Sequence, residues 1–449
     1  VIKLMTPNCF MASVDLKDAY YSVAVSPASQ KLLKFIWKGQ LYKYTCLPNG
    51  LSSCPRKFTK LLKPAFTLLR KRGHVSSGYI DDAYLQGNTY DDCANNVVDT
   101  VNLFSTLGLV VHPDKSVLEP TQSLEFLGFL LDSILMRVTL TLQKVDKIIS
   151  ACTSLLNKSV RVFIRDVARV IGLLVSSFPG VMFGPLHYRA LEKDKVQALQ
   201  LCRGNFDSYM MLSPSAIEEL QWWVASLPTA YNEVTHGTPD VVINTDASLS
   251  GWGGVLHDLS CGGHWSLGEQ TFHINYLELL AVLYVLQSFQ THLENKHVRV
   301  LIDNTTAVSC ITHMGTSHSD LCNRITKTIW EWCIATHIWI SAAHIPGVDN
   351  VGADIESRKL RDETEWMLNR SVFSKVLEML HLTPDIDLFA SRLNHQVEQY
   401  VSYQPDPQAV AVDAFLINWE DYDIFYAFPP FSLITQVLQK IQHQQATGL

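Results

Sequence analysis

The stretch GHVSSGYIDDAYLQG, residues 73–87, holds two short apolar runs on either side of Asp81 and Asp82. This pattern predicts a β-hairpin with the two acids at its turn. An Asp-Asp pair by itself is usually only a turn. Here, however, the apolar run MASV (11–14) leads into a third acid, Asp15. Three aspartates from two adjacent β elements can supply the carboxylates that the two divalent cations of phosphodiester synthesis need.

Around this hairpin the sequence alternates between strand-like and helix-like segments. The expected elements are a strand at 11–25 that enters a helix or turn, a β-hairpin at 34–47 turning at Lys38-Gly39, helices at 52–72 and 90–108, a strand at 125–132, and helices at 141–157 and 160–177. The helix at 52–72 carries basic residues at helical spacing around Phe58, which predicts a basic outer face. Pro64 would kink this helix or split it in two.

Charge is unevenly distributed along the chain. Residues 1–72 hold thirteen Lys or Arg and two Asp, a charge of +11, whereas the whole chain carries −7, so the remainder carries −18. This asymmetry predicts a basic surface for a polyanion on the N-terminal part. An ordinary solvated face is the alternative.

A second compositional unit follows the Pro-containing stretch at 226–240. It reads as three strands within 241–266, a helix at 274–289, a strand at 298–304, two helices and a strand at 338–346, a mixed α/β pattern. Acids fall at the ends of these elements or within them: Asp246, Glu278, Asp303 and Asp354. A buried helix seldom carries an unpaired Glu among Leu and Val, because burying that charge is costly. The pattern therefore predicts a second carboxylate site.

Length and composition exclude several classes of protein. A chain of 449 residues exceeds one ordinary core, so two to four domains are expected. No segment has about 18 uninterrupted apolar residues, which argues against a membrane-spanning helix. Ten cysteines without a Cys-x-x-Cys pair argue against a zinc ribbon or a disulfide framework. We expect reduced cysteines in an intracellular protein, cytoplasmic or nuclear. The start lacks an initiator Met and the zones of a signal peptide, which predicts a piece of a longer chain.

Five segments occur in a fixed order: VDLKDAYYSV (14–23), LPNGLSSCPRKF (47–58), YIDD (79–82), HPDKS (112–116) and EFLGF (125–129). Together they resemble the motif series of retroelement reverse transcriptases, over about residues 10–205. The resemblance implies that Asp15, Asp81 and Asp82 form a metal-binding triad. The carbonyl of Leu16 would complete a coordination sphere.

The same resemblance implies roles for residues that contact substrates. Tyr20 would be the steric gate, because a flat ring against the sugar C2′ leaves no room for a 2′-OH. Lys115 would protonate the leaving pyrophosphate, with a surface lysine as the alternative. Asn49 stands where these families more often carry Gln or Phe. Two further sets of contacts are implied. The nucleotide and template pocket would be lined by Asn49, Gly50 and Pro55. The primer grip would be Phe126, Leu127 and Gly128, for which a core strand is the alternative.

The segments TDAS, NYLELLA, IDNTTAV and AAHIPGVDNVGAD resemble ribonuclease H across residues 240–360. That family uses four acids and two magnesium ions to hydrolyse the RNA strand of a hybrid. The resemblance implies that the four are those named above, and that His344, in a mobile catalytic loop, assists protonation or product release. A structural histidine is the alternative.

A closer resemblance is to DIRS-type retrotransposons. It rests on segments such as FIWKGQLYKYTCLPNGLSSCP (35–55), VIGLLVSSFPGVMFGPLHYRAL (170–191) and LTPDIDLFASRLNHQ (382–396). Near the end, AFPPF (427–431) is faintly similar to the Asn/Asp-Pro-Pro-Phe/Tyr motif of adenine methyltransferases. Phe428 stands where the polar residue should be, so we expect a loop and no methyl transfer.

The predicted fold is α+β and α/β multidomain, a partial right-hand polymerase (palm and thumb) followed by a ribonuclease H-like α/β domain. The predicted boundaries are 1–135 for a palm with partial fingers, 136–235 for thumb and connection helices, 236–360 for the ribonuclease H-like domain and 361–449 for a weakly methyltransferase-like tail.

The predicted function is RNA-directed DNA synthesis with degradation of the RNA strand, using two Mg²⁺ per site, with Mn²⁺ as the alternative ion. The expected partners are an RNA template, a DNA primer, their hybrid, deoxynucleoside triphosphates and other element-encoded proteins, without a membrane. Two alternatives stay open. One is a decayed or domesticated nucleic-acid-binding protein, and the other is a ribonuclease H with a structural polymerase remnant.

Overall fold

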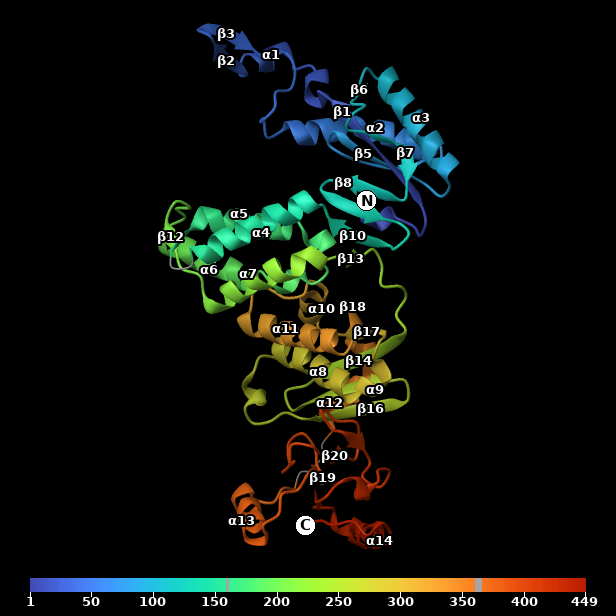
Figure 1. Ribbon diagram of the computed structural model, residues 1–449, viewed down its shortest axis with the longest axis vertical. Coiled ribbons are helices and arrows are strands. Elements are labelled where there is room, and N and C mark those ends of the chain that lie inside the picture. Colours follow the sequence, from blue (N-terminus) through green and yellow to red (C-terminus); the bar gives the residue numbers. More distant parts are fainter. Residues whose placement is uncertain (159–160, 360–365) are drawn as a thin grey trace. The chain divides into compact units, whose positions relative to one another are not determined.

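The computed structural model describes residues 1–158, 161–359 and 366–449. It divides into two compact units, Val1–Thr235 and His236–Leu449 (Figure 1). Both units mix helices with sheets, as the sequence predicted.

The first unit is built on a sheet of order β4-β5-β1-β6, in which β7 also pairs with β1. The apolar run in β1 is buried, and Val14 shares one core with Phe58 and Leu62 of α2. Helix α3 packs against β5 and β1, and α2 packs against β4. The bounds are β1 Phe10–Lys17, α2 Cys54–Lys71, β4 Val75–Tyr79, β5 Asp82–Gly87, α3 Tyr90–Thr106, β6 Val110–Val111 and β7 Val117–Thr121.

Two predicted local features of this unit are confirmed, and one of the two outcomes predicted for Pro64, a split helix, does not occur. The hairpin of β2 (Lys34–Trp37) and β3 (Gln40–Lys43) turns at Lys38-Gly39, where both residues have positive φ. A short helix, α1 (Pro27–Gln30), precedes it. The basic helix is present as α2, but it is not split at Pro64. The buried apolar residues before and after Pro64 both pack against the sheet. This tertiary packing outweighs the local cost of a proline inside a helix.

The prediction of one strand at 125–132 is wrong. Strands β8 and β9 form a hairpin there, with Phe126 paired to Phe129 across the turn. Leu127 has φ +52° and Gly128 has φ +77°, the left-handed pair that a two-residue hairpin turn requires. The continuous apolar run concealed this turn. The hairpin belongs to a second sheet, whose strands are β8 Ser123–Phe126, β9 Phe129–Asp132, β10 Arg137–Leu140 and β13 Asn232–Glu233.

Between β10 and β13 the chain forms four helices, which share a core that includes Ile148, Val167, Leu191 and Trp223. Two of them fall within the predicted helices at 141–157 and 160–177, although residues 159–160 lie outside the described residues. The bounds are α4 Leu142–Asn157, α5 Ile164–Val175, α6 Arg189–Leu201 and α7 Pro214–Ser226, with a short pair β11 Val162–Phe163 and β12 Tyr209–Met210.

The second unit contains a five-stranded sheet of order β16-β15-β14-β17-β18. Strands β14, β17 and β18 are parallel, and β15 and β16 add an antiparallel meander. The predicted strands and helices of this region are all present. Their bounds are β14 Val241–Ala247, β15 Gly251–Leu256, β16 Leu259–His264, α8 Ile274–Ser288, α9 Gln290–Leu293, β17 His297–Ile302, α10 Thr305–Thr312, α11 Asp320–Ala335, β18 Trp339–His344 and α12 Val351–Arg358.

Residues 366–449 form the C-terminal segment of this unit, within which the sequence predicted a loop at AFPPF (427–431). Loops predominate in this segment, but they enclose a small core around the buried ring of Trp419. Residues 360–365, at the predicted boundary between the ribonuclease H-like domain and the tail, lie outside the described residues. The elements are α13 Arg370–Leu380, α14 Ile434–Gln444, and the parallel strand pairs β19 Ile386–Asp387 with β22 Phe425–Tyr426 and β20 Val401–Ser402 with β21 Ala411–Val412.

All ten cysteines are described, and none of them forms a disulfide with another described residue. Among the described residues, no helix combines the length and the apolar character that crossing a membrane would take.

Candidate active sites

The first candidate site lies where β1 and β5 run antiparallel. Asp15 is directly paired with Asp82 in this register. Asp81 lies in the turn before β5, and its backbone carbonyl accepts a hydrogen bond from Leu16 N at 3.0 Å. The predicted hairpin with the acids at its turn is therefore confirmed. Strand pairing brings together acids that stand more than sixty residues apart in the sequence.

Electrostatics make this group of acids unfavourable without a counter-charge. The pKa of Asp82 is raised to about 6, first by burial and then by the charges of Asp81 and Asp15, while Lys115 lowers it. Asp82 also shares a side-chain hydrogen bond with Asp15. Neighbouring carboxylates repel one another when they are all ionised. A bound cation would relieve that repulsion. The cluster of carboxylates therefore favours binding of a metal ion.

A cleft of about 390 Å³ opens over Asp15 and Asp81, and Asp82 is not part of its lining. Its lining includes six residues predicted from the sequence, namely Asp15, Leu16, Tyr20, Asn49, Asp81 and Lys115, together with His112. Tyr20 packs edge-on against Phe58 at 5.7 Å between ring centroids, which fixes its ring at the cleft. The pKa of Tyr20 is raised, chiefly by burial and next by Asp81.

The other predicted contacts lie outside the set that lines this cleft. Gly50 has φ +89° in the turn after Asn49, and Pro55 lies in the first turn of α2. Phe126 is buried in a neighbouring core, whereas Leu127 is 41% exposed at the hairpin tip. Gly128 completes that tip. The primer-grip role of this hairpin stays a prediction.

The loop at 112–116 contributes residues that the sequence reasoning did not single out. Ser116 Oγ accepts a hydrogen bond from Asp15 N at 3.0 Å and donates one to the His112 carbonyl at 2.7 Å. His112 N donates to the Asp15 carbonyl at 2.8 Å. These bonds fix the backbone of Asp15. The HPDKS motif marked this loop, but nothing in it indicated that the serine would contact a residue 101 positions earlier.

The second candidate site joins β14, α8 and β17. Ligand oxygens of Asp246, Glu278 and Asp303 all lie within 4.8 Å of one another. Within residues 1–158, 161–359 and 366–449, no other group of three His, Cys, Asp or Glu side chains meets this spacing, and the acids of the first site do not.

Burial makes ionisation of the acids in this second group unfavourable. Glu278 is 4% exposed, and its Oε2 has no hydrogen-bond partner within the described part of the chain. Its pKa is raised to about 9 by burial first, then by Asp246 and Asp303. The pKa of Asp246 is also raised, chiefly by burial, although a hydrogen bond from Ser357 opposes the shift. An orphaned carboxylate oxygen facing two other acids fits a divalent cation, which prefers oxygen ligands.

The fourth predicted acid is not part of this group. Asp354 Oδ1 accepts a hydrogen bond from Arg358 Nε at 2.6 Å, one helical turn further along α12. Its side chain is 41% exposed. His344 ends β18 and is exposed. The turn after it passes beside the acids, because a Cβ atom at Gly347 would lie 3.1 Å from Asp303 Oδ2.

Helix α12 is held to the site by a serine and a glycine that the sequence analysis missed. Ser357 Oγ donates to Asp246 Oδ2 at 2.5 Å. A Cβ atom at Gly253 of β15 would lie 2.5 Å from Ser357 N and 2.6 Å from the Ala353 carbonyl. Only a glycine permits this close approach of helix to strand. The GWGG sequence was the signal that could have indicated it.

A separate cavity of about 560 Å³ lies at the N-terminal ends of α8, α10 and α11. Its polar lining includes His273, Asn275, Thr305 and His318, and none of the four predicted acids. Sequence reasoning did not find this cavity, because its lining comes from three separate segments.

Comparisons with known proteins agree with this arrangement. Residues 2–131 match the family described as reverse transcriptase (RNA-dependent DNA polymerase), and residues 238–331 match the RNase H-like domain found in reverse transcriptase. The chain is 23% identical over 385 residues to the enzymatic polyprotein of cauliflower mosaic virus (strain NY8153), covering 80% of this chain and 51% of that protein. Over 123 residues it is 31% identical to the Pro-Pol polyprotein of simian foamy virus type 1, covering 27% of this chain and 10% of that protein.

A solved structure of the foamy viral protease-reverse transcriptase in complex with an RNA/DNA hybrid is 16% identical, with a TM-score of 0.43. The similarity covers 82% of this chain and 48% of that chain.

These matches define the class: the chain carries a reverse transcriptase domain followed by an RNase H-like domain. The predicted fold class, a polymerase region with an RNase H-like α/β domain C-terminal to it, is confirmed. More particularly, the domain pair and its relatives support a reverse transcriptase and ribonuclease H polyprotein. The chain spans about half the length of the first curated relatives it matches.

Proposed function

We propose that this chain is an RNA-directed DNA polymerase and an RNA–DNA hybrid ribonuclease, with one activity in each of its two units. The observation that carries the proposal is that each matched domain contains its own acidic site. Asp15, Asp81 and Asp82 are neighbours where β1 runs beside β5, and ligand oxygens of Asp246, Glu278 and Asp303 lie within 4.8 Å of one another in the second unit.

In the first unit, Asp15, Asp81 and the carbonyl of Leu16 would hold divalent ions, with Asp82 as a supporting acid. Tyr20, fixed against Phe58, would exclude a ribose 2′-OH from the cleft. Lys115 lines the same cleft and would donate a proton to the leaving pyrophosphate. Gly50, Pro55 and the hairpin tip at 126–128 would contact the template and the primer.

In the second unit, Asp246, Glu278 and Asp303 would hold the ions, and Asp354 would join them after releasing Arg358. His344, exposed at the end of β18, would protonate the leaving group or assist product release. Divalent ions at such sites lower the pKa of the attacking hydroxyl or water and stabilise the leaving oxygen. Mg²⁺, two ions per site, fits the all-oxygen donors, and Mn²⁺ is the alternative.

The substrates would be an RNA template with a DNA primer, deoxynucleoside triphosphates, and the hybrid that synthesis produces. The exposed lysines of α2, Lys57, Lys60 and Lys63, would contact the phosphate backbone. We further propose the finer assignments made from the sequence: an intracellular protein of a DIRS-type element, its partners other proteins of that element. Its domain boundaries would fall near residues 135, 235 and 360.

A ribonuclease H with a structural polymerase remnant is the second candidate. It is favoured by one observation: among the described residues, only the acids of the second unit lie close enough to share an ion as they stand.

Primer extension on an RNA template, run beside cleavage of a labelled hybrid, tests both candidates. Each assay is done with Mg²⁺ and with EDTA. Extension and cleavage that both require Mg²⁺ would support the two-activity proposal. Cleavage without extension would support the second candidate, and neither activity would contradict both.

A further inference from the structure

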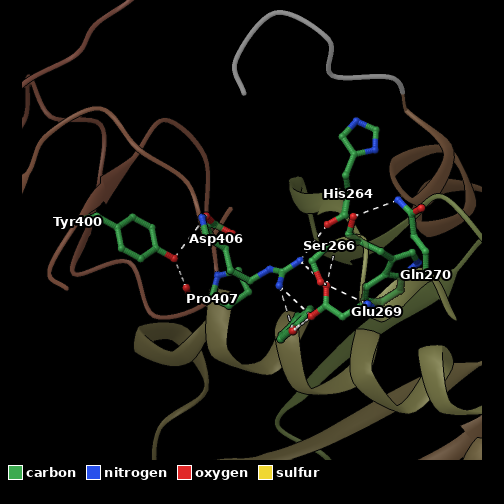
Figure 2. Close-up of polar contacts among 10 residues, drawn as sticks. His264, Ser266, Glu269, Gln270, Tyr400, Asp406 and Pro407 are labelled. Carbon is green, nitrogen blue, oxygen red and sulfur yellow. Dashed lines mark hydrogen bonds and ion pairs between the residues drawn. The ribbon is translucent and has the colours of Figure 1, made fainter. Parts of the chain in front are cut away.

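Arg392, in the C-terminal segment, donates four hydrogen bonds to the RNase H-like part of the same unit. Figure 2 labels two of the residues that accept them, Glu269 and His264. Arg392 Nη1 donates to Glu269 Oε1 at 2.9 Å and to Tyr284 OH at 3.2 Å. Its Nη2 donates to Glu269 Oε2 at 3.1 Å and to the His264 carbonyl at 2.9 Å. The side chains of Arg392 and Glu269 are only 17% and 15% exposed. This is a planar, two-pronged pairing that a lysine cannot reproduce.

The groups around this contact are themselves fixed. Arg392 N donates to Asp406 Oδ2 at 2.5 Å, which holds the arginine's own loop (Figure 2). The guanidinium lies 4.4 Å from the ring centroid of Tyr284, whose hydroxyl donates to Glu269 at 2.5 Å. Burial alone would raise the pKa of Glu269, but the hydrogen bond from Tyr284 and the charge of Arg392 lower it overall. Glu269 is therefore stabilised as a carboxylate.

A series of three hydrogen bonds, joined by covalent links within the chain, leads from this contact to the second acidic site. Trp265 directly follows His264, and its Nε1 donates to the Ser248 carbonyl at 2.8 Å. Ser248 Oγ then donates to the Ser357 carbonyl at 2.7 Å, and Ser357 Oγ donates to Asp246 Oδ2 at 2.5 Å. These four residues are between 2% and 8% exposed. Buried groups of this kind are close-packed and do not move independently.

We propose that Arg392 is a positioning residue for the ribonuclease H-like site. By fixing the end of β16 at His264, it holds Trp265, and through Ser248 and Ser357 it orients the carboxylate of Asp246. This inference rests on the proposed nuclease function. It also gives the C-terminal segment a role, because the segment supplies an outer support for the acids and is not merely an appended tail.

The test uses the full chain with Arg392→Met, Arg392→Lys and Tyr284→Phe, and with Arg370→Met as a matched control on the exposed start of α13. Mn²⁺ binding is measured by calorimetry without nucleic acid, and hybrid cleavage is measured as separate kcat and KM values. Arg392→Met should weaken Mn²⁺ binding and lower kcat by about tenfold, the low end for groups that orient metal ligands. KM should stay within about twofold, because substrate contacts are untouched.

The conservative variants separate positioning from simple structural support. Arg392→Lys keeps the positive charge but cannot form the two parallel hydrogen bonds to Glu269. Its losses of Mn²⁺ affinity and of kcat should therefore be intermediate, and Arg370→Met should match the wild type. A double variant, Arg392→Met with Ser357→Ala, should lose no more than Ser357→Ala alone, because the two residues act in one series. Additive losses would overturn the route through Ser357.

Two further outcomes would decide the matter. If Arg392→Met does not fold, Arg392→Lys and Tyr284→Phe take its place. Wild-type Mn²⁺ affinity and kcat in the folded variants would overturn the inference. A wild-type protein that binds Mn²⁺ but cleaves no hybrid would refute the proposed function, and a weaker Mn²⁺ affinity in Arg392→Met would still support the positioning role.

Discussion

Replacing Glu278 with Gln tests whether the buried acids of the second unit are built for a cation. In the absence of metal, the fold opposes ionisation of Glu278, whose pKa is raised from 4.5 to about 9. The unfolded chain ionises this group above about pH 4.5. The stabilising effect of the protonated form is therefore fully present below pH 4.5 and is lost as the pH rises toward 9.

The size of the effect follows from that interval. A pH of 7 lies about 2.5 units above the pKa of Glu278 in the unfolded chain and still below its pKa in the folded protein. At about 1.4 kcal/mol per unit, folding without metal then loses about 3 kcal/mol relative to acid pH. Glu278→Gln removes the titrating group and keeps the shape. In EDTA at pH 7 the variant should be more stable than the wild type by an amount of that order, with a flatter dependence on pH.

Urea unfolding between pH 5 and pH 8.5 in EDTA measures the difference, and Glu331→Gln is the matched control. Glu331 has a side chain that is 56% exposed, so its replacement should change little. Adding Mg²⁺ should reverse the order, because a ligand that binds only the folded state stabilises it. The reasoning is refuted if Glu278→Gln is less stable than the wild type in EDTA at pH 7, or if both show the same slope with pH.

The two activities should be separable, because their acids lie in different units: Asp81→Asn should reduce primer extension by about a hundredfold or more and spare hybrid cleavage, and Asp303→Asn should do the reverse. Loss of both activities in a folded single variant would contradict the two-site assignment. Tyr20→Ala should raise the ratio of ribonucleotide to deoxyribonucleotide incorporation in primer extension, and an unchanged ratio would remove Tyr20 as the steric gate. Exchanging Lys57, Lys60 and Lys63 for Gln should reduce the slope of log K against log salt for primer–template binding by up to about 3, since each phosphate contact contributes roughly 0.9. An unchanged slope would exclude this face of α2 from the interface.

Local sequence patterns predicted the elements that carry the acids. The hairpin around Asp81 and Asp82 could be predicted because its apolar runs, its turn and its acids are adjacent in the chain. The prediction of a single strand for EFLGFLLD (125–132) was wrong for a related reason. Its apolar residues continue through the turn, so only the left-handed conformation at Leu127 and Gly128 shows where the strand reverses. Periodicity predicts elements but does not predict a turn hidden within an apolar run.

Contacts between distant segments were beyond this reasoning. Ser357 bonds Asp246 from 111 residues away, and Arg392 bonds Glu269 from 123 residues away. Neither contact changes the hydrophobic periodicity of the sequence, which is the signal from which the elements were predicted. The pairing of Asp354 with Arg358 is different, because residues four apart on a helix are neighbours. That contact could have been predicted, and it would have set Asp354 apart from the other three acids.

The close packing of α12 on Gly253 limits how the second site can rearrange. A helix backbone seated against a strand with no room for a methyl group cannot roll or slide inward. Any approach of Asp354 toward the other acids must therefore come from rotation of its own side chain. The barrier to that rotation is mainly the exposed ion pair with Arg358, and such pairs contribute only about 0–1 kcal/mol. The nuclease site would thus assemble its last ligand by a fast rotamer change on a stationary scaffold, without a hinge or a moving loop.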